Sequence, residues 1–386
     1  MRTAMLALVT ACALSALIMP AGAATYVIAP DGSEDFPDIA SCVAVCGDGD
    51  IIELTDGTFT GPGNTNVFIT GIVITIRSQS GSSTNCRIDC NGQPGTTTRA
   101  FLIEDTPSWG FTIQDIAIEN GYCTQDWGGG ILISNSASVS LNNVAFRANY
   151  ASWGGAICLG PGTIYVAASE CRFLDNIAET GGGAVYAHSG ESLWTGCRFI
   201  ANTTSVDGGA CHCDAGGEMD FYMSTFSRNL AGLGGGALYY RGVTDLDMGS
   251  CTFSGNSCVG DAAINIGPDP SVDIDNTLIV FTTDGLGLDC RAPVVDIDNT
   301  NIYGNGDGDW TGSIAGFLGS GHNISLDPQF CSDVPDDHQN WTLQEDSPCT
   351  ALNSLAGIQI GAFGKACGLT PAQQTNWGVL KHKFRR

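Results

Sequence analysis

The sequence has few basic residues and few long hydrophobic runs. Of its 386 residues, 15 are Lys or Arg and 40 are Asp or Glu, which gives a formal net charge of −25. Nucleic-acid binding depends on clustered cations, so this composition argues against a nucleic-acid partner. After the apolar run at 4–19, no second hydrophobic segment is long enough to span a membrane. No window keeps the helical period of about 3.6 residues for three turns, which argues against long helices.

What the sequence has instead is a pair of short motifs that alternate along its middle part. The first is Gly-Gly-Ala/Gly followed by an apolar residue, and it starts at Gly128, Gly154, Gly182, Gly208 and Gly235. The second is Phe-x-x-Asn, and it ends at Asn149, Asn176, Asn202, Asn229 and Asn256. Successive Gly-Gly starts lie 26, 28, 26 and 27 residues apart, and successive Asn residues lie 27, 26, 27 and 27 apart. A fixed period in this range predicts stacked structural repeats.

Each repeat is patterned as strands. Apolar residues alternate at period two, as in Val139 and Leu141, and short segments are bounded by Gly, Asn, Asp and Ser. One period is therefore one coil of a parallel β-solenoid. The Gly pair supplies a positive φ and room at a tight corner. Each Phe is expected in the interior, and each Asn is expected to be a left-handed turn residue whose amide bonds its counterpart in the next coil.

The same register continues on both sides of this block. Upstream, Cys86-Arg87-Ile88-x-x-Asn91 matches Cys171-Arg172-Phe173-x-x-Asn176, so the coils begin before residue 91. Downstream, 272–277 and 295–300 both read VDIDNT. About ten coils result, and at roughly 4.8 Å per coil the rod would be some 45 Å long.

These paired motifs resemble the repeats of the polymorphic outer-membrane proteins of chlamydiae and, more broadly, the pectin-lyase-like superfamily. The resemblance covers roughly residues 86–305. It implies an all-β fold, a single-stranded right-handed parallel β-helix, and it implies no activity because these are scaffold motifs. The opening Asp31-Gly32-Ser33-x-Asp35-Phe36 resembles the start of pectin methylesterases, where such a stretch precedes a capping helix.

The chain divides into five expected segments. Residues 1–23 read as a signal peptide cut after Ala23, and a lipidated Cys12 in Val9-Thr10-Ala11-Cys12 is the alternative. The other segments are an N-terminal cap at 24–50, β-helix repeats at 51–310, closing loops at 311–368, and a linker with a basic tail at 369–386. The tail is either a sorting or surface-attachment element or a frayed terminus.

A short helix is expected to cover the open end of the first coil. Pro37 suits the first helical position, Asp35 or Phe36 precedes it, and the helix would run to about Cys46 and end at Gly47. Such a cap is needed because an uncapped solenoid leaves strand edges unpaired and its core exposed.

Cysteines are numerous, with 17 in the sequence, and an exported protein can form disulfides from them. Cys171 and Cys197 occupy the same position in adjacent coils, within bridging distance. A disulfide and a stack of free thiols in the core both remain open for this pair. The closing loops contain three candidate clamps: Cys331, Cys349 and Cys367.

Two stretches are considered as metal sites. In Cys211-His212-Cys213-Asp214, strand alternation sends Cys211 and Cys213 inward and His212 outward, which favours core thiols or inter-coil disulfides over a Zn²⁺ or copper site. The acidic runs at 269–275, 296–298 and 304–309 either bind Ca²⁺ through carboxylate and carbonyl oxygens or consist of solvated turn residues. These runs offer one candidate for a structural Ca²⁺ site: Asn305, Asp307 and Asp309. No other cofactor is expected.

The sequence identifies no catalytic residue. Glycan hydrolysis needs two carboxylates in a groove, and lyase chemistry needs a base beside bound Ca²⁺. The sequence does not show the combined Asp-Asp and Gly-His-Gly blocks expected of polygalacturonases, or the Arg-Pro elements of pectate lyases. His188 with Glu191, or Arg241 with Asp245, could form a site, but nothing in their spacing requires it. We therefore expect no turnover of pectate, alginate or neutral glucans.

The leading expectation is a secreted or cell-surface β-helix protein that acts as an adhesin-like rod and binds an extracellular glycan or a surface protein. A divergent polysaccharide lyase or glycoside hydrolase and a structural envelope component are the alternatives. Sugar rings stack on aromatic faces, so Trp127 and Trp153, each immediately before a Gly pair, are the candidate glycan-stacking residues. Further aromatic candidates are Trp109, Trp194, Tyr239 and Tyr240. The pattern indicates neither the ligand nor the oligomeric state.

Overall fold

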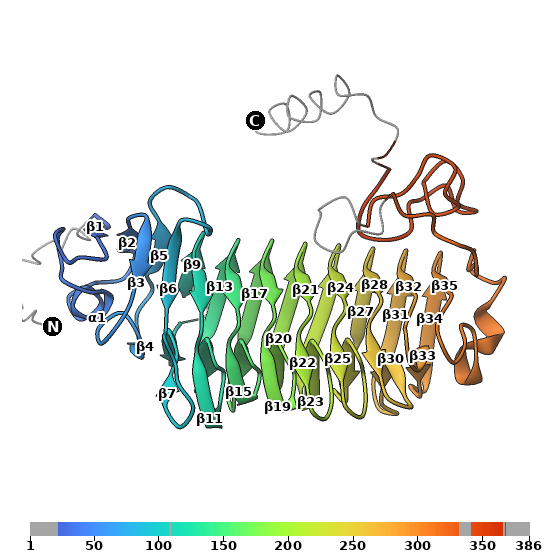
Figure 1. The fold of residues 1–386 in the computed structure, drawn as a ribbon, viewed down its shortest axis with the longest axis horizontal. Coiled ribbons are helices and arrows are strands. Elements are labelled where there is room, and N and C mark those ends of the chain that lie inside the picture. The colour runs from blue at the N-terminus through green and yellow to red at the C-terminus, as the bar shows by residue number, and fades with distance from the viewer. Residues whose placement is uncertain (1–21, 108–109, 332–340, 366, 368–386) are drawn as a thin grey trace, which may run out of the picture.

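The computed structural model describes residues 22–107, 110–331, 341–365 and 367. Within them the chain winds into one long rod, with short strands stacked side by side from one end to the other (Figure 1). No helix in these ranges is long and apolar enough to cross a membrane. Of the expected signal peptide at 1–23, only residues 22 and 23 are described, and the tail at 369–386 lies outside the described residues.

Three sheets with parallel pairing along the stack form the walls of the rod, apart from one antiparallel pair, β7 with β11. The 18-stranded sheet contains β1 (Thr25–Ile28), β2 (Ile51–Leu54), β4 (Val67–Thr70), β5 (Thr75–Ser78), β8 (Phe101–Glu104), β9 (Phe111–Gln114), β12 (Ile131–Ser134), β13 (Ser138–Asn142), β16 (Ile157–Leu159), β17 (Tyr165–Ser169), β20 (Val185–Thr195), β23 (Cys211–Tyr222), β26 (Leu238–Tyr240), β27 (Leu246–Gly249), β30 (Ala262–Ile266), β31 (Ser271–Asp275), β33 (Leu286–Cys290) and β34 (Val294–Asp298). The ten-stranded sheet contains β3 (Gly57–Phe59), β6 (Cys86–Asp89), β10 (Ala117–Glu119), β14 (Ala145–Arg147), β18 (Arg172–Leu174), β21 (Arg198–Ile200), β24 (Thr225–Ser227), β28 (Thr252–Ser254), β32 (Leu278–Val280) and β35 (Asn301–Tyr303). The seven-stranded sheet contains β7 (Thr97–Thr98), β11 (Tyr122–Trp127), β15 (Tyr150–Trp153), β19 (Ile177–Gly181), β22 (Thr203–Thr204), β25 (Leu230–Ala231) and β29 (Ser257–Cys258).

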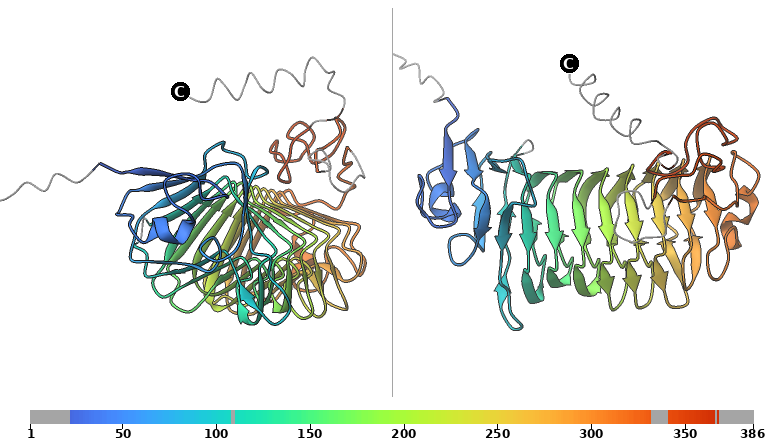
Figure 2. Two further views of the ribbon diagram at one scale, coloured as in Figure 1. Left: turned by 60° about the vertical axis from the view of Figure 1, so that its left-hand side comes forward. Right: turned by 45° about the horizontal axis from the view of Figure 1, so that its top comes forward.

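The largest sheet consists of two rows that run along the rod. One row passes through β8, β12 and β16, and the other passes through β9, β13 and β17. The two rows join in the middle of the rod because β20 and β23 are long enough to cross both of them, as the paired register of these strands shows. Beyond β23 the rows separate again into β26 and β27. The predicted parallel β-helix is confirmed, and Figure 2 shows the coils nearly end on.

The interior is filled by side chains that stack from coil to coil. Phe146, Phe173, Phe199, Phe226 and Phe253 occupy equivalent positions in the ten-stranded sheet, and all are buried. Their ring centroids lie between 4.4 and 5.0 Å apart, with nearly parallel planes. Each of these rings therefore stacks on the equivalent rings of the neighbouring coils, as the sequence period predicts.

The five repeated asparagines form one buried column beside these rings. The Asn202 Oδ1 atom accepts hydrogen bonds from both the backbone N–H and the side-chain Nδ2 of Asn176, at 3.1 and 2.9 Å. Asn202 Nδ2 donates in turn to Asn229 Oδ1 at 3.0 Å and to the Phe173 carbonyl at 3.0 Å. Every polar atom of the Asn202 side chain is thus paired inside the rod.

One detail of the asparagine prediction is wrong. The left-handed residue of each turn is not the Asn but the residue before it, for example Asp175 with φ of 54° and Ala201 with φ of 55°. The reason is that the Asn side chain must point into the rod to bond the next coil, and the reversal of the chain is made one residue earlier. The other positions in this set are Ala148 (φ 51°), Arg228 (φ 53°) and Gly255 (φ 63°).

The first glycine of each Gly-Gly motif has a positive φ, as predicted. Gly182 has φ of 63°, and a Cβ atom there would lie 2.1 Å from the Val185 carbonyl oxygen. The second glycine of this pair faces the next coil, where a Cβ atom on Gly183 would lie 2.1 Å from the Gly209 carbonyl oxygen. The motif is therefore required by backbone geometry and by the close approach of successive coils.

The capping helix is shorter than predicted and begins later. Helix α1 spans Ile39–Val43, and Asp38 rather than Asp35 or Phe36 is its N-cap, since Asp38 Oδ1 accepts the backbone N–H of Ser41 at 2.8 Å. Asp35 instead accepts the backbone N–H of Val27 in β1, which keeps it out of the helix. The helix ends at the C-cap Ala44, before Cys46. It lies at the N-terminal end of the rod and contributes Ile39 and Cys42 to the core (Figure 1).

Beyond β35 the chain turns through a 3-10 helix, η1 (Gly312–Phe317), and then folds back beside the last coils (Figure 1). Gly361 N donates to the Asn276 carbonyl, and Ala362 N donates to Thr252 Oγ1, so this segment is tied to coils far from it in sequence. A small second core forms there from Leu278, Ile324, Leu343, Cys349 and Ile360.

Among the three candidate clamps in the closing loops, Cys331 and Cys367 form a disulfide, whereas Cys349 is a buried free thiol. Cys171 and Cys197 are also free and fully buried, which decides between the two alternatives left open for them. In this part of the rod cysteine therefore acts as a small core residue.

Candidate functional site

At one outward-facing position of the largest sheet, the residues of successive coils lie side by side but differ in type. It follows the apolar residue that closes each Gly-Gly motif and is the second residue of β16, β20, β23 and β26, and it continues as the fourth residue of β30. The residues paired along it are Cys158, Tyr186, His212, Tyr239 and Asn265. A second column, immediately before the Gly-Gly motif, pairs Trp127 with Trp153, Trp153 with Gly181, Gly181 with Asp207, and Asp207 with Gly234. These two adjacent columns bring most of the chemically versatile side chains of the rod together.

The aromatic side chains of these columns form a continuous row, which we call the outer strip. It consists of Trp127, Trp153, Tyr186, His188, His212 and Tyr239. The Trp153 ring lies 4.5 Å from the Tyr186 ring, centroid to centroid, and the His212 ring lies 4.9 Å from that of Tyr239. Tyr186 and His212 are 5.3 Å apart, and Trp127 lies 5.7 Å from His188. Tyr186 and His212 are buried beneath the others, which are partly exposed.

A carboxylate, Asp214, is held at the centre of the strip. Tyr186 Oη donates a 2.5 Å hydrogen bond to Asp214 Oδ2, and His188 Nδ1 lies 3.8 Å from the same oxygen. The pKa of Asp214 falls to about 2, because the His212 ring, the Tyr186 hydroxyl and the His188 ring favour the carboxylate, while burial opposes the shift. Burial raises the pKa of Tyr186, and the neighbouring Asp214 raises it further. At neutral pH the site therefore presents an ionised carboxylate beside a protonated phenol.

His212 is a buried polar group of the strip whose Nε2 faces Asp214 and whose Nδ1 has no hydrogen-bond partner within the described ranges. Its side chain is 7% exposed, and neither ring nitrogen makes a hydrogen bond within the described ranges. Asp214 Oδ1 lies 3.4 Å from Nε2. A Cβ atom on Gly181 would lie 2.6 Å from His212 Nδ1 and 2.7 Å from the Trp153 ring. Gly181 therefore stands at the position where the two preceding coils have tryptophan. Because it has no side chain, His212 and Trp153 have room beside it.

The strip ends in charged groups. Arg241 stacks on Tyr239, with Cζ 3.7 Å from the ring centroid, and its Nη1 donates to the Tyr240 carbonyl at 2.9 Å. Burial raises the pKa of Asp207, against the opposing influence of His212 and Arg241. Burial also raises the pKa of Asp261, against a hydrogen bond from Asn265 Nδ2. Two partly buried carboxyl groups therefore lie at the end of an aromatic row.

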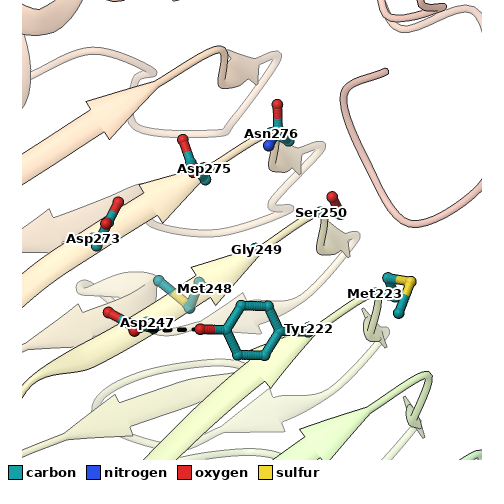
Figure 3. A pocket seen from close by; sticks show the side chains of 9 residues that line it. All are labelled: Tyr222, Met223, Asp247, Met248, Gly249, Ser250, Asp273, Asp275 and Asn276. Carbon is teal, nitrogen blue, oxygen red and sulfur yellow. Dashed lines mark hydrogen bonds between the residues drawn. The ribbon is translucent and has the colours of Figure 1, made fainter. Parts of the chain in front are cut away.

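A second, purely acidic surface lies on the neighbouring row of the same sheet. Asp247, Asp273 and Asp296 are paired in register on β27, β31 and β34, and Asp220 Oδ1 accepts the backbone N–H of Asp247. A shallow pocket of about 330 Å³ opens there, lined by Tyr222, Asp247, Asp273 and Asp275 among others, and Tyr222 Oη donates to Asp247 Oδ2 at 3.2 Å (Figure 3). Burial raises the pKa of Asp220 to about 6, and the surrounding carboxylates add to the shift.

The structure places the aromatic candidates from the sequence in different environments. Trp127 and Trp153 lie in register on β11 and β15 and are partly exposed, so their faces are available on the strip. Trp194 and Tyr240 are fully buried, which rules out their stacking on a ligand. Trp109 lies outside the described residues.

The remaining sequence candidates do not gather into one site. Cys211 and Cys213 are buried in the core and His212 lies on the opposite side of β23, so the three do not converge. His188 lies beside Asp214 rather than Glu191, which pairs in register with Tyr165. Arg241 lies on Tyr239, and Asp245 instead accepts a hydrogen bond from Ser271 Oγ.

The residues of the Ca²⁺ hypothesis lie in the turn after β35. Asp309 Oδ1 accepts hydrogen bonds at 2.9 Å from both the backbone N–H and Nδ2 of Asn305, and Asn305 Oδ1 accepts the backbone N–H of Thr282. Asp307 is exposed. The oxygens of Asn305 and Asp309 thus already serve the fold, and Ca²⁺ binding at this turn stays a prediction.

Sequence reasoning missed Tyr186, Asp207, His212, Asp214 and Asp261 as members of one site. Their signal lay in the repeats themselves, because aligning the coils on the Gly-Gly motif shows which positions keep their residue and which change it. The two columns next to the motif change most, from tryptophan to glycine to aspartate.

Comparisons with known proteins agree with the fold and go no further. No family model and no curated protein sequence matches the chain. Among solved structures, the crystal structure of the pectate lyase Pel9A is similar over 90% of this chain and 97% of that one, with a TM-score of 0.52 and 13% sequence identity. At this identity the likeness concerns the fold alone. The chain is a right-handed parallel β-helix of the architecture seen in that lyase.

Proposed function

We propose that this protein is a secreted or cell-surface β-helix rod that binds an extracellular glycan along the outer strip. The observation that carries the proposal is the row of aromatic rings in contact from Trp127 to Tyr239, in which partly exposed rings lie over the buried rings of Tyr186 and His212. Aromatic faces offer large rigid apolar surfaces for the C–H groups of sugar rings, while nearby polar groups can bond the hydroxyls. Successive coils are spaced at roughly 4.8 Å. This spacing is close to the length of one sugar ring, so each coil can contact about one ring.

The polar groups along the strip suit a neutral glycan. Asp214 is ionised and accepts hydrogen bonds, and its side chain is 40% exposed, so a hydroxyl group can reach it. Arg291 is paired with Asp289 at 3.2 Å and donates to Asn265 Oδ1 at 2.9 Å, so its charge is already balanced by the protein. A polyuronate would meet the net charge of −25 and would be repelled.

The test is binding of soluble neutral polysaccharides, measured by isothermal titration calorimetry. We expect Trp153→Ala to weaken binding about tenfold or more, because truncating a central aromatic group removes its stacking surface. Trp127→Ala should act in the same direction. Tyr165→Ala, which removes a 36% exposed ring from the neighbouring row, is the control and should leave binding unchanged.

Equal affinity of the parent and Trp153→Ala for every glycan bound would contradict the proposal. Unfolding curves of each variant must be recorded in parallel, because Trp153 also packs on Tyr186 and His212. The proposed location outside the cytoplasm is checked separately, by fractionating cells that express the full chain and probing the medium and the surface.

A further inference from the structure

Asp214, at the centre of the outer strip, is a carboxylate that a ligand can reach. Its side chain is 40% exposed. Tyr186 Oη donates to Oδ2, His188 Nδ1 lies 3.8 Å from the same oxygen, and His212 Nε2 lies 3.4 Å from Oδ1. A carboxylate has about four acceptor positions, so these neighbours leave part of it facing solvent. Asp214 can therefore accept a further donor without displacing a protein group.

No arginine or lysine balances the charge of this carboxylate. Among the described residues, the only basic side chains within 4 Å of Asp214 are the two histidines, which are charged only when protonated. Arg241, at the end of the strip, lies on the ring of Tyr239. Arg291 is paired with Asp289. The strip thus presents one negative charge that the protein leaves without a permanent positive partner.

The side chains around Asp214 are aromatic. Tyr186, which donates to the carboxylate, lies 4.5 Å from the Trp153 ring, centroid to centroid. His188 lies 5.7 Å from the Trp127 ring. Both tryptophans are partly exposed. The face of an aromatic ring attracts a cation within about 6 Å of its centre, tryptophan most strongly. The carboxylate and the rings beside it therefore both attract a positive group.

The charge of the whole protein acts in the same direction. The formal net charge is −25. Asp247, Asp273 and Asp296 form an acidic row on the neighbouring row of the same sheet. A field of this sign attracts cationic ligands to the surface and repels anionic ones. A cationic group on a bound glycan therefore gains both from its contacts and from its surroundings.

A glycan made of amino sugars combines the two features that the strip can recognise. The C–H face of each sugar ring can stack on an exposed tryptophan, as for a neutral glycan. Its protonated amino group offers three hydrogen-bond donors and a positive charge to Asp214. Because such a polymer carries one amino group per ring, an amino group comes near Asp214 in any register along the strip.

We propose that the outer strip binds a glycan with protonated amino groups more tightly than the same glycan without them, and that Asp214 confers this preference. The inference rests on the proposed glycan binding and names the ligand class of that site. A neutral glycan remains a ligand, because the aromatic faces contact both forms. Asp214 adds an ion pair only to the amino form.

The test compares two oligosaccharides that share one backbone. The glucosamine hexasaccharide carries free amino groups, which are protonated in weakly acidic buffer, and the N-acetylglucosamine hexasaccharide is its uncharged counterpart. Isothermal titration calorimetry measures both with the parent and with Asp214→Asn, which keeps the shape of the side chain and removes its charge. Asp273→Asn is the control, because it removes the same charge from an exposed strand position on the acidic surface.

We expect the parent to bind the amino form about three- to tenfold more tightly than the acetylated form, the range for an exposed ion pair beside an aromatic ring. Asp214→Asn should lose this preference and keep the affinity for the acetylated form within about twofold. Asp273→Asn should keep the preference of the parent. Added salt should reduce the preference, because the charges are partly exposed.

Equal affinities of the parent for the two hexasaccharides would overturn the inference and leave the proposed function intact. A preference that persists in Asp214→Asn, or that Asp273→Asn removes equally, would also overturn it, because the overall charge would then be the cause. Loss of both affinities in Asp214→Asn would show that Asp214 supports the strip and does not select its ligand. If the parent binds neither form and no neutral polysaccharide, the proposed function fails and the inference fails with it.

Discussion

The asparagine column and the outer strip run along the same rod in the same parallel register, yet they are built in opposite ways. The column repeats one residue at five successive coils, and each amide is fully paired with its neighbours. The strip keeps tryptophan only from Trp127 to Trp153 and then changes its residues from coil to coil, and it includes His212, whose Nδ1 has no hydrogen-bond partner within the described ranges. Repetition in this protein serves folding, and departure from the repeat provides groups that a ligand can use.

The largest expected effect comes from breaking the column. Asn202→Leu removes the acceptor of the Asn176 backbone N–H and Nδ2 and the amide donor to the Phe173 carbonyl, and it leaves Asn229 Oδ1 with only the backbone N–H of residue 202. Because these groups are buried, we expect a loss of about 3–5 kcal/mol of unfolding free energy. Thermal and chemical unfolding measure it, and a midpoint within a degree or two of the parent would show that the column is not needed.

Two adjacent glycines, Gly234 and Gly235, test the difference between the outer strip and the repeat motif. Gly235 belongs to the repeat motif, has φ of 60° and would place a Cβ atom 2.3 Å from the Leu238 carbonyl oxygen. Gly235→Ala should therefore cost about 2 kcal/mol or more, since both the left-handed backbone and the close backbone contact oppose it. Calorimetric unfolding of the purified variant is the measurement.

Gly234→Ala should behave differently, although it lies one residue away. The atoms that its Cβ would meet are the ends of the Asp207, Asp261 and Tyr239 side chains, which can move. We expect a stability change below about 1 kcal/mol, because only the ends of side chains have to move. Calorimetric unfolding of both variants side by side measures the difference, and an equal loss of stability in Gly234→Ala and Gly235→Ala would contradict it.

The acidic surface gives a small effect with a distinct dependence on pH. Burial raises the pKa of Asp220 to about 6 in the folded chain, above its ordinary value of 3.8. Between these pH values the folded state holds the proton more tightly than the unfolded state, so this group's contribution to stability falls as pH rises from about 4 to about 6.

Asp220→Asn should therefore raise the unfolding free energy at pH 7, by about 1 kcal/mol once solvent screening is allowed for. The gain should vanish near pH 4. Unfolding curves across this pH range measure it, with Asp269→Asn in an exposed turn as the control. An equal gain at pH 4 and pH 7 would show that the ionisation of the buried Asp220 is not the cause.

The sequence by itself determined the rod. A period of 26 to 28 residues, marked by Gly-Gly and Phe-x-x-Asn, was enough to predict stacked parallel coils, the inward rings and the column of amides. This worked because neighbouring coils pair in register, so one periodic position in the sequence becomes one column in space. Where the period gave no information, as at the capping helix, the predicted limits were wrong by several residues, because Asp38 rather than Asp35 caps it.

Only the tertiary structure decided the composition of the outer strip and the surroundings of its carboxylates. Tyr186 meets Asp214 because β20 and β23 lie in register, and His212 fits because Gly181 leaves room for it. Asp207 and Asp261 both approach Gly234, which contributes no side chain. Such contacts depend on the size and direction of individual outward side chains. A repeat pattern predicts where each residue lies along the rod, but it does not predict which residues a surface side chain contacts.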